Sequence, residues 1–349
     1  MRNMLVTGGC GFIGANFVRY LLEESGFTGR IINVDKLTYA GNLENLADIE
    51  TDYPDRYTFI KADICDGTRM AEIFGKYQID GVCHFAAESH VDRSIVKPDD
   101  FIQTNIIGTF NLLESARSRL HKMIRFHHIS TDEVYGSLGR QGYFTETTPY
   151  KPNSPYSASK AASDHLVRAY HKTYGLRMTI SNCSNNYGPY QFPEKLIPLV
   201  ILNALDGKPL PIYGDGRNVR DWLYVRDHCS AIWTIMKHGK NGETYNVGGG
   251  SEMENVKLVE MICDILDEMK RLKNNRSRRD LITFVKDRPG HDRRYAIDCK
   301  KLNREMNWHP EASLESGIRE TIKWYMDNPR WVERVKSGEY QTWIKTHYL

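Results

Sequence analysis

Tyr156 and Lys160 carry the clearest chemical signal in this sequence of 349 residues. A spacing of four places both side chains on one face of a helix, one turn apart. An ammonium group beside a phenol favours the phenolate, so Lys160 is expected to lower the pKa of Tyr156 toward the range of a general base. The same spacing occurs by chance in many helices, as a packed ring beside a surface lysine. Its meaning therefore depends on the surrounding motifs.

Two adjacent acids, Asp132 and Glu133, follow an apolar run that ends in Ser130 and Thr131. Thr131 can hydrogen-bond a substrate hydroxyl or the oxygen of Tyr156. Loss of water from a substrate requires one group that removes a carbon-bound proton and another that protonates the departing hydroxyl. Alone, the acid pair would be a solvated loop or a helix N-cap. Beside the Tyr–Lys pair, it favours acid–base chemistry.

A glycine-rich segment from Gly8 to Gly14 lies between a candidate strand and a candidate helix. Glycines at this spacing let a turn close and let the backbone approach a pyrophosphate, which the helix N-terminus can bind. Asp35 ends the next candidate strand, where a carboxylate accepts hydrogen bonds from a ribose 2′-hydroxyl and repels a 2′-phosphate. The pattern therefore favours NAD over NADP, although Lys36 softens the repulsion.

The elements that would position these residues alternate along the chain. Apolar runs predict strands at 3–7, 30–34, 57–61, 81–85, 125–130 and 177–182, and helical patterns begin near Gly11, Thr68, Asp99 and Ser154. This alternation predicts an α/β fold with a Rossmann-type, doubly wound parallel sheet. Pro and Gly become frequent after residue 182. We therefore expect an NAD-binding domain over 1–182 and a smaller C-terminal substrate-binding lobe over 183–349, with the chain free to cross back between them.

Composition narrows the class of protein. Lys and Arg number 47 against 44 Asp and Glu, which gives a net charge of +3 and excludes a protein held on nucleic acid by bulk charge. The longest apolar run, residues 196–202, is too short to span a membrane. Seven cysteines without a C-x-x-C pair argue against a disulfide framework or a zinc site. We expect a cytoplasmic protein without a metal, a membrane segment or a nucleic-acid partner.

Several longer segments support a more specific interpretation: 86–94, 184–190, 192–198, 220–225 and 287–292. Together with the motifs above, they resemble the extended short-chain dehydrogenase/reductase family, and within it the nucleotide-sugar 4,6-dehydratases that act on dTDP-glucose. The resemblance covers nearly the whole chain. It implies a hydro-lyase that converts dTDP-glucose to dTDP-4-keto-6-deoxyglucose by C4 oxidation, water elimination across C5 and C6, and hydride return to C6.

The resemblance also implies residue roles. Glu133 removes the C5 proton and Asp132 protonates the leaving C6 hydroxyl, while Tyr156 takes the C4 hydroxyl proton beside Lys160 and Thr131 orients the sugar. The implied cofactor is NAD, with contacts from Gly8, Gly11, Phe12, Ile13, Gly14, Asp35, Lys36, Leu37, Thr38, Asp63, Ile64, Phe85, Ala86, Ala87, Ser89, Thr104, Tyr156, Lys160 and Asn186. The implied substrate contacts are Ser89, Thr131, Asn185, Lys195, Leu196, Pro211, Tyr213, Arg220, Asn255, Asp287, Arg288, Pro289, Gly290 and His291. The resemblance further implies a homodimer, in which the helical patterns over 99–117 and 154–174 pair across a two-fold axis as a four-helix bundle.

Other interpretations stay open at this point. A UDP-glucose 4-epimerase does not use the pair Asp132 and Glu133, and a GDP-mannose 4,6-dehydratase would prefer NADP, against which Asp35 counts. A non-catalytic NAD sensor has no need to keep both acids together with Tyr156 and Lys160. A nucleic-acid-binding role rests only on the basic stretch 270–279, for which a solvated loop is the favoured interpretation. Gln191, Gly250, Ser251 and Arg226 depart from the residues usual in the family, all outside the catalytic positions.

Overall fold

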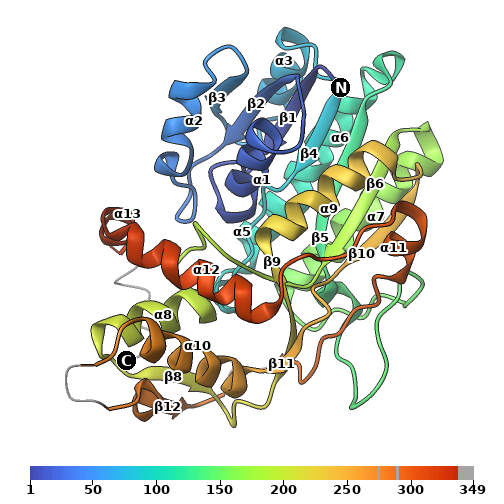
Figure 1. The fold of residues 1–349 in the computed structure, drawn as a ribbon. Helices are drawn as coiled ribbons and strands as arrows, with labels where there is room; N and C mark the ends of the chain where they lie inside the picture. Colours follow the sequence, from blue (N-terminus) through green and yellow to red (C-terminus); the bar gives the residue numbers. More distant parts are fainter. Residues whose placement is uncertain (273–275, 288–290, 337–349) are drawn as a thin grey trace.

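A sheet of seven strands, each parallel to its neighbours, forms the upper part of the computed structural model (Figure 1). The structure describes residues 1–272, 276–287 and 291–336. The strands are β1 (Asn3–Thr7), β2 (Arg30–Asp35), β3 (Tyr57–Lys61), β4 (Gly81–His84), β5 (Arg125–Thr131), β6 (Arg177–Cys183) and β10 (Glu243–Val247). Their order is β10-β6-β5-β4-β1-β2-β3. The order reverses between β1 and β4, where such sheets bind ligands beyond their carboxyl ends. The expected Rossmann-type sheet is confirmed.

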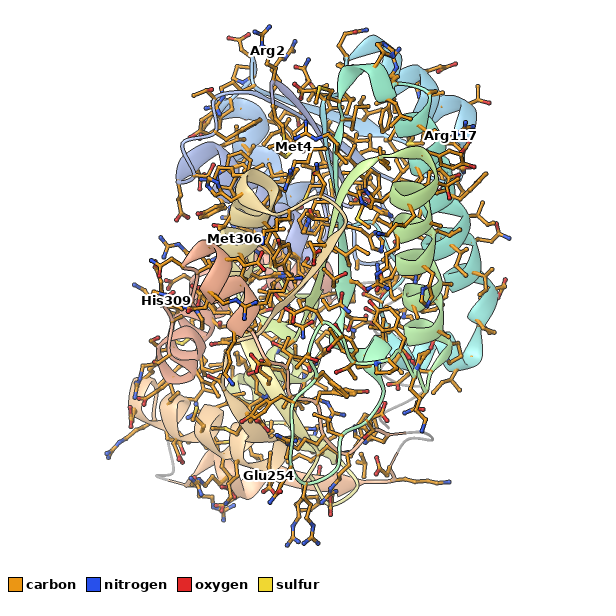
Figure 2. The ribbon with its side chains drawn as sticks, turned by 90° about the vertical axis from the view of Figure 1, so that its right-hand side faces the viewer. Arg2, Met4, Arg117, Glu254, Met306 and His309 are labelled. Carbon is orange, nitrogen blue, oxygen red and sulfur yellow. The ribbon has the colours of Figure 1, made fainter. Side chains whose placement is uncertain are left out.

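Helices cover both faces of this sheet, which explains why its strands are apolar on both sides. Met4 and Val6 of β1 pack with α1 (Phe12–Glu23) and α9 (Val225–His238). Leu5 points to the opposite face, toward α3 (Gly67–Lys76), α6 (Thr109–Arg117) and α7 (Pro155–Tyr174). Figure 2 shows Met4 among the side chains inside this part of the molecule. The further elements around the sheet are η1 (Leu43–Leu46), α2 (Ala47–Asp52), α4 (Val91–Val96), α5 (Pro98–Phe101), η2 (Ile102–Gly108), η3 (Leu120–Lys122), η4 (Asp132–Tyr135) and α11 (Lys300–Met306).

A smaller lobe lies below the sheet in Figure 1. Its strands form two small sheets, β11 (Glu252–Glu254), β9 (Val219–Tyr224) and β7 (Asn185–Tyr187) in one, and β12 (Ile282–Val285) with β8 (Leu210–Tyr213) in the other. Its helices are α8 (Leu196–Asp206), α10 (Asn255–Met269), η5 (Arg278–Leu281), α12 (Leu314–Asp327) and α13 (Pro329–Val335). Val200, Ile262 and Ile318 lie in its own apolar core. Glu254 marks the lower end of the molecule in Figure 2.

The chain passes between the two parts more than once. After β9, α9 returns to the face of the large sheet and β10 pairs with β6 at its edge. Later, α12 and α13 lie across the boundary between the two parts (Figure 1). The domain boundary at residue 182 therefore remains a prediction. The chain connects the two parts more than once.

The basic stretch 270–279 contains a charged side chain that is buried. Arg278, in the basic stretch expected to be a solvated loop, is buried, with Nη1 2.6 Å from Asp267 Oδ1 and Nε donating to the Ala204 carbonyl over 3.1 Å. The buried guanidinium thus joins η5 to α8 and α10 within the smaller lobe. No helix in the described ranges combines the length and the apolar character needed to cross a membrane.

Candidate active site

A cavity of about 320 Å³ lies beyond the carboxyl ends of β1, β2, β4, β5 and β6. It brings together all five expected catalytic residues, Thr131, Asp132, Glu133, Tyr156 and Lys160. It also collects most of the expected binding residues: Gly8, Gly11, Phe12, Ile13, Gly14, Asp35, Lys36, Thr38, Asp63, Ile64, Phe85, Ala86, Ala87, Ser89, Thr104, Asn185, Asn186 and Lys195. Residues separated by more than 180 positions thus meet at one edge of the sheet.

The glycine loop leaves no space for side chains. Gly8 has φ +70°, and a Cβ there would lie 2.7 Å from the backbone of Ala86. A Cβ on Gly14 would lie 2.2 Å from the Gly8 carbonyl oxygen. The loop therefore folds tightly against the start of α1, whose first residues line the cavity. This is the arrangement that a pyrophosphate requires.

Asp35 is held by backbone amides at the end of β2. Its Oδ2 accepts from the Cys10 N–H over 3.0 Å and its Oδ1 from the Leu37 N–H over 2.8 Å. Burial raises the pKa of Asp35, and these two hydrogen bonds oppose the shift. Leu37 does not line the cavity, but its backbone, at φ +59°, holds Asp35; its contact with the cofactor stays a prediction.

Lys36 turns toward Asp63, with Nζ 2.6 Å from Oδ2. Burial acts to raise the pKa of Asp63, but the hydrogen bond and charge of Lys36 lower it overall. Asp63 therefore carries a negative charge that partly neutralises Lys36. Lys36 is therefore a weaker partner for a 2′-phosphate than an unpaired lysine would be.

Thr131, Asp132 and Glu133 form the turn at the end of β5. The Thr131 Oγ1 accepts from the Glu133 N–H over 3.2 Å and donates to Asp132 Oδ1 over 3.4 Å. Asp132 is only 2 % exposed. Burial first, and then the charges of Glu133 and Asp221, raise the pKa of Asp132 well above its usual range. Asp132 therefore holds its proton more firmly than a solvent-exposed aspartic acid, and Glu133 is half-buried beside it.

Tyr156 and Lys160 lie on one face of α7, as expected, but their electrostatics differ from the expectation. Burial and the nearby Glu133 raise the pKa of Tyr156 above its ordinary value, because they outweigh the hydrogen bond with Thr131, which acts to lower it. The Lys160 Nζ donates to the Ile129 carbonyl over 2.7 Å and lies 3.5 Å from His128 Nε2. Burial lowers the pKa of Lys160 to about 8. Without a bound cofactor or substrate, the Tyr156 side chain is therefore a neutral phenol at pH 7.

Asn105 orders the loop that follows β4. It belongs to η2, a π-helical segment, which is a conformation frequent at functional sites. Its Oδ1 accepts from the Glu88 N–H over 2.9 Å, and its Nδ2 donates to the Glu88 carbonyl over 3.0 Å and to Ser159 Oγ over 2.8 Å. One buried amide thus fixes the 85–89 loop to α7, beside Tyr156.

The sequence analysis missed part of the cavity wall. The additional lining residues are Val34, Tyr39, Ala40, Gly41, Ala62, Glu88, Ile129, Ser130, Cys183, Ser184, Gln191, Phe192 and Glu194. Cys183 ends β6 and Ser184 follows it, so the tendency of ligands to bind beyond the carboxyl ends of parallel strands could have found them. Glu194 is buried, 3.3 Å from Arg93 Nη2. No local pattern predicts this contact, because the two residues lie 101 positions apart in the chain.

Some expected substrate contacts lie elsewhere. Leu196, Pro211, Tyr213, Arg220, Asn255, Asp287 and His291 do not line the cavity, and Arg288, Pro289 and Gly290 are outside the described residues. Arg220 is nevertheless near: its Nη2 donates to the Asp292 carbonyl over 2.9 Å, and its charge opposes the raised pKa of Asp132. The His291 Nδ1 lies 2.6 Å from Asp287 Oδ1. Their contact with substrate stays a prediction.

The cavity wall fits a polar dinucleotide. Among the described residues, Asp132 Oδ2, Asn185 Oδ1 and Gln191 Oε1 are buried atoms without a hydrogen-bond partner, and all three residues line the cavity. Such atoms are costly unless a ligand satisfies them. With the glycine loop and Asp35, they match NAD and a sugar substrate. No group of His, Cys, Asp and Glu in the described ranges is arranged to hold a metal ion.

Comparisons with known proteins agree with this geometry. The family model described as GDP-mannose 4,6 dehydratase matches residues 5–321. A dTDP-glucose 4,6-dehydratase from Shigella flexneri is 57% identical, with 99% of this chain and 98% of the relative covered. A Neisseria meningitidis enzyme of the same name is 56% identical, with 98% of each chain covered.

Solved structures are similar over most of the chain. DesIV, a dTDP-glucose 4,6-dehydratase from Streptomyces venezuelae with NAD bound, has 46% identity and a TM-score of 0.88, covering 96% of this chain and 100% of its own. The Bacillus anthracis dTDP-glucose 4,6-dehydratase in complex with NAD has 48% identity and a TM-score of 0.86 with the same coverage. This chain therefore belongs to the GDP-mannose 4,6-dehydratase family of extended short-chain dehydrogenases/reductases, together with the dTDP-glucose 4,6-dehydratases that it matches over nearly its whole length.

Proposed function

We propose that this protein is a hydro-lyase that converts dTDP-glucose to dTDP-4-keto-6-deoxyglucose with NAD as its cofactor. The observation that carries the proposal is the meeting of Asp132, Glu133, Tyr156 and Lys160 in one cavity beside the glycine loop. The relatives named above, at 56–57% identity, support the same activity. An epimerase of this fold has no use for the two adjacent acids Asp132 and Glu133.

The residues of α7 and β5 would handle the C4 hydroxyl. NAD, when bound, supplies the oxidant for C4 and the reductant for C6, and its positively charged ring adds to Lys160 in favouring the phenolate of Tyr156. Tyr156 then accepts the proton of the C4 hydroxyl. Thr131, whose Oγ1 already bonds Asp132 and the Glu133 backbone, holds the sugar hydroxyl in line with Tyr156.

The elimination would use the unequal carboxyl groups of the 132–135 turn. Oxidation at C4 acidifies the C5 proton, which Glu133 removes. Burial beside Glu133 raises the pKa of Asp132, which suits this group to protonate the C6 hydroxyl as it leaves. Two neighbouring acids with different surroundings thus take opposite roles.

We also propose a homodimer in the cytoplasm. Exposed apolar side chains lie along α4 to α6, namely Ile95, Val96, Ile102, Ile107 and Phe110, with Val96 67% exposed. Several exposed apolar side chains on neighbouring elements are typical of an interface between subunits. The seven cysteines are free thiols, as is usual in a reducing compartment.

Isotope transfer tests the proposed reaction. Pure protein is incubated separately with dTDP-glucose, UDP-glucose and GDP-mannose, and the products are identified by mass. With dTDP-glucose deuterated at C4, the label is expected in the C6 methyl group of the same molecule, without crossover in mixtures of labelled and unlabelled substrate. Turnover in heavy water is expected to place deuterium at C5. Label retained at C4, or a requirement for stoichiometric NAD, would contradict the proposal.

A further inference from the structure

Helix α7 carries four polar residues at a constant spacing of four: Tyr156, Lys160, Asp164 and Arg168. This spacing stacks them along one face of the helix, toward the sheet. The first two belong to the catalytic cavity, whereas the mechanism above does not use the last two. Asp164 is fully buried, so its charge must be balanced by groups packed around it.

The Asp164 carboxylate is built into a dense set of hydrogen bonds. Its Oδ2 accepts from Ser130 Oγ over 2.9 Å and from Tyr150 OH over 2.7 Å. Arg168 Nη2 donates in turn to Tyr150 OH over 2.7 Å. Burial acts to raise the pKa of Asp164, but the contacts with His128, Lys160 and Tyr150 lower it overall. Asp164 is therefore an anion inside the protein.

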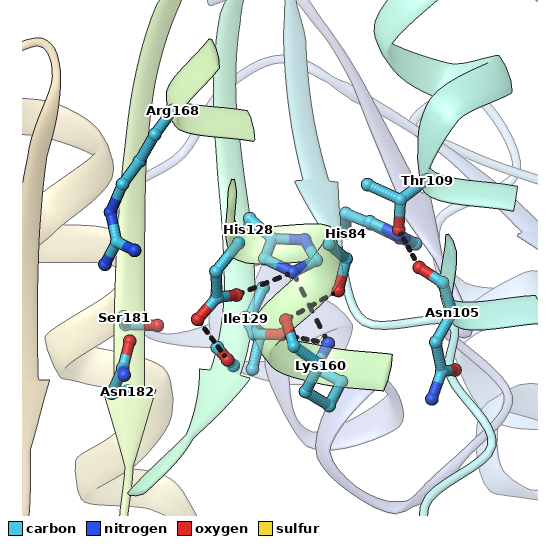
Figure 3. Close-up of polar contacts among 12 residues, drawn as sticks. His84, Asn105, Thr109, His128, Ile129, Lys160, Arg168, Ser181 and Asn182 are labelled. Carbon is cyan, nitrogen blue, oxygen red and sulfur yellow. Dashed lines mark hydrogen bonds and ion pairs between the residues drawn. The ribbon is translucent and has the colours of Figure 1, made fainter. Parts of the chain in front are cut away.

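His128 lies between this anion and the catalytic lysine. Its Nε2 is 3.3 Å from Asp164 Oδ1 and 3.5 Å from Lys160 Nζ (Figure 3). Its Nδ1 has no hydrogen-bond partner in the part of the chain that the structure describes. A single nitrogen thus lies close to both groups. It can accept from the Lys160 ammonium, and the Asp164 Oδ1 beside it has no hydrogen-bond partner among the described residues. The protonation of Lys160 and the charge of Asp164 are coupled through it.

Lys160 is surrounded on several sides. His84 faces it from β4, His128 from β5, Cys183 from β6, and Asp164 and Tyr156 from α7 itself. Burial lowers the pKa of both histidines, so they are neutral at pH 7. Burial raises the pKa of Cys183, which stays a thiol. The only full negative charge among these neighbours at neutral pH is therefore that of Asp164.

We propose that Asp164, acting through His128, is the positioning residue that keeps Lys160 in its ammonium form in the active site. Burial pulls Lys160 toward the neutral amine, and the anion one helical turn away opposes this. Since Lys160 must be charged to favour the Tyr156 phenolate, the stripe on α7 links a buried carboxylate to the base. The inference deepens the proposed function but depends on it only for the role of Lys160.

Direct titration of Lys160 tests this inference without any substrate. The protein is labelled with [ε-13C]lysine, the Lys160 signal is assigned with a Lys160→Arg variant, and its chemical shift is followed against pH. Asp164→Asn is nearly isosteric and keeps hydrogen-bonding atoms for its partners. An opposite charge at this range shifts a pKa by about 1–3 units, so the Lys160 midpoint is expected to fall by about that amount.

The neighbouring histidines of β5 provide a matched pair. His128→Phe removes the acceptor that favours the Lys160 ammonium, so the midpoint is expected to fall in the same direction but by less than in Asp164→Asn. His127→Phe makes the same substitution at the adjacent buried position, whose ring bonds Thr179 and Ser181 on β6 and does not meet Lys160. It is expected to lower thermal stability without moving the Lys160 midpoint.

The pH dependence of turnover is a second measurement on the same variants. Loss of the ammonium at high pH should set the alkaline limb, so in Asp164→Asn this limb is expected at lower pH and activity to recover toward the acid side. An unchanged Lys160 midpoint in both variants, or an equal shift in His127→Phe, would overturn the inference. If dTDP-glucose is not the substrate, the titration still gives its result, so the two proposals fail separately.

Discussion

The cofactor side and the catalytic side of this cavity are built from different parts of the polypeptide. On the cofactor side, the backbone does most of the work: Gly8 and Gly14 permit contacts that no side chain could enter, and two N–H groups hold Asp35. On the catalytic side, long side chains from β5 and α7 converge. There the important property is the charge of buried groups such as Asp132 and Lys160.

This difference predicts two kinds of functional loss on substitution. Where shape decides, a substitution should remove the cofactor at every pH. Where charge decides, a substitution should leave the cofactor bound and change the rate, the step reached or the pH dependence. The following predictions test this separation, beginning with the largest effect.

Gly14→Ala should abolish NAD binding. The added Cβ would lie 2.2 Å from the Gly8 carbonyl oxygen and 2.8 Å from the Gly9 Cα, both of them backbone atoms that cannot move aside cheaply. The measurement is the NAD content of the purified protein after desalting, together with its melting temperature with added NAD. Gly139→Ala, at a glycine with open space around it, is the matched control and should retain NAD.

Tyr156→Phe should retain NAD but lower kcat by about 10²–10⁴, the usual contribution of a general base. Only one hydroxyl is removed, so circular dichroism and the melting temperature should change little. The loss should persist across the pH range, because no ionisable group is left at the position. Turnover close to that of the unsubstituted protein would show that another residue is the base and that the assignment on α7 is wrong.

Asp132→Asn combined with Glu133→Gln should separate oxidation from elimination. Tyr156 and Lys160 remain, so C4 can still be oxidised, whereas the two amides cannot exchange the protons that elimination needs. Reduced nicotinamide is expected to accumulate on the protein, visible by its absorbance, with little dehydrated product. Normal product formation by the double variant would refute the roles given to both acids.

The same contrast between local patterns and buried charge decides which features of the site could be predicted from the sequence alone. The glycine loop, Asp35 and the carboxyl ends of β4 and β5 are local patterns, and the structure places them at one cavity as expected. The raised pKa of Tyr156 could not be read from its spacing to Lys160, since that spacing reports proximity and not burial. Tertiary burial, which decides the sign, depends on residues far apart in the chain.

Contacts between distant segments were equally out of reach. Nothing near Glu194 indicates that Arg93 will meet it, and nothing before residue 240 indicates that β10 will return to the edge of β6. Likewise, Arg278 reads as one more charge in a basic run, yet it is buried against Asp267. Composition averages over such cases, because it cannot distinguish a solvated charge from one that packing has paired.

The smallest predicted effect concerns the choice between NAD and NADP. Lys36 is 58% exposed and its Nζ lies 2.6 Å from Asp63 Oδ2, so Asp63 holds the ammonium group next to Asp35 in the sequence in an ion pair. Asp63→Asn should free Lys36 to meet a 2′-phosphate. Because exposed ion pairs contribute only about 0.2–1 kcal/mol, the preference for NAD over NADP should fall by no more than roughly fivefold.

Calorimetric affinities for both dinucleotides measure this change, and its salt dependence provides a further criterion. Asp66→Asn is the control: it removes the same charge from the same loop, and asparagine preserves the N-cap that Asp66 provides to α3 through the Arg69 N–H. The preference should then be unchanged. If both variants alter it equally, the discrimination comes from the general negative potential of the loop. If neither variant alters the preference for NAD over NADP, Asp35 alone sets that preference. The specificity of the cofactor side then depends, like its shape, on backbone groups, because these hold Asp35 in place.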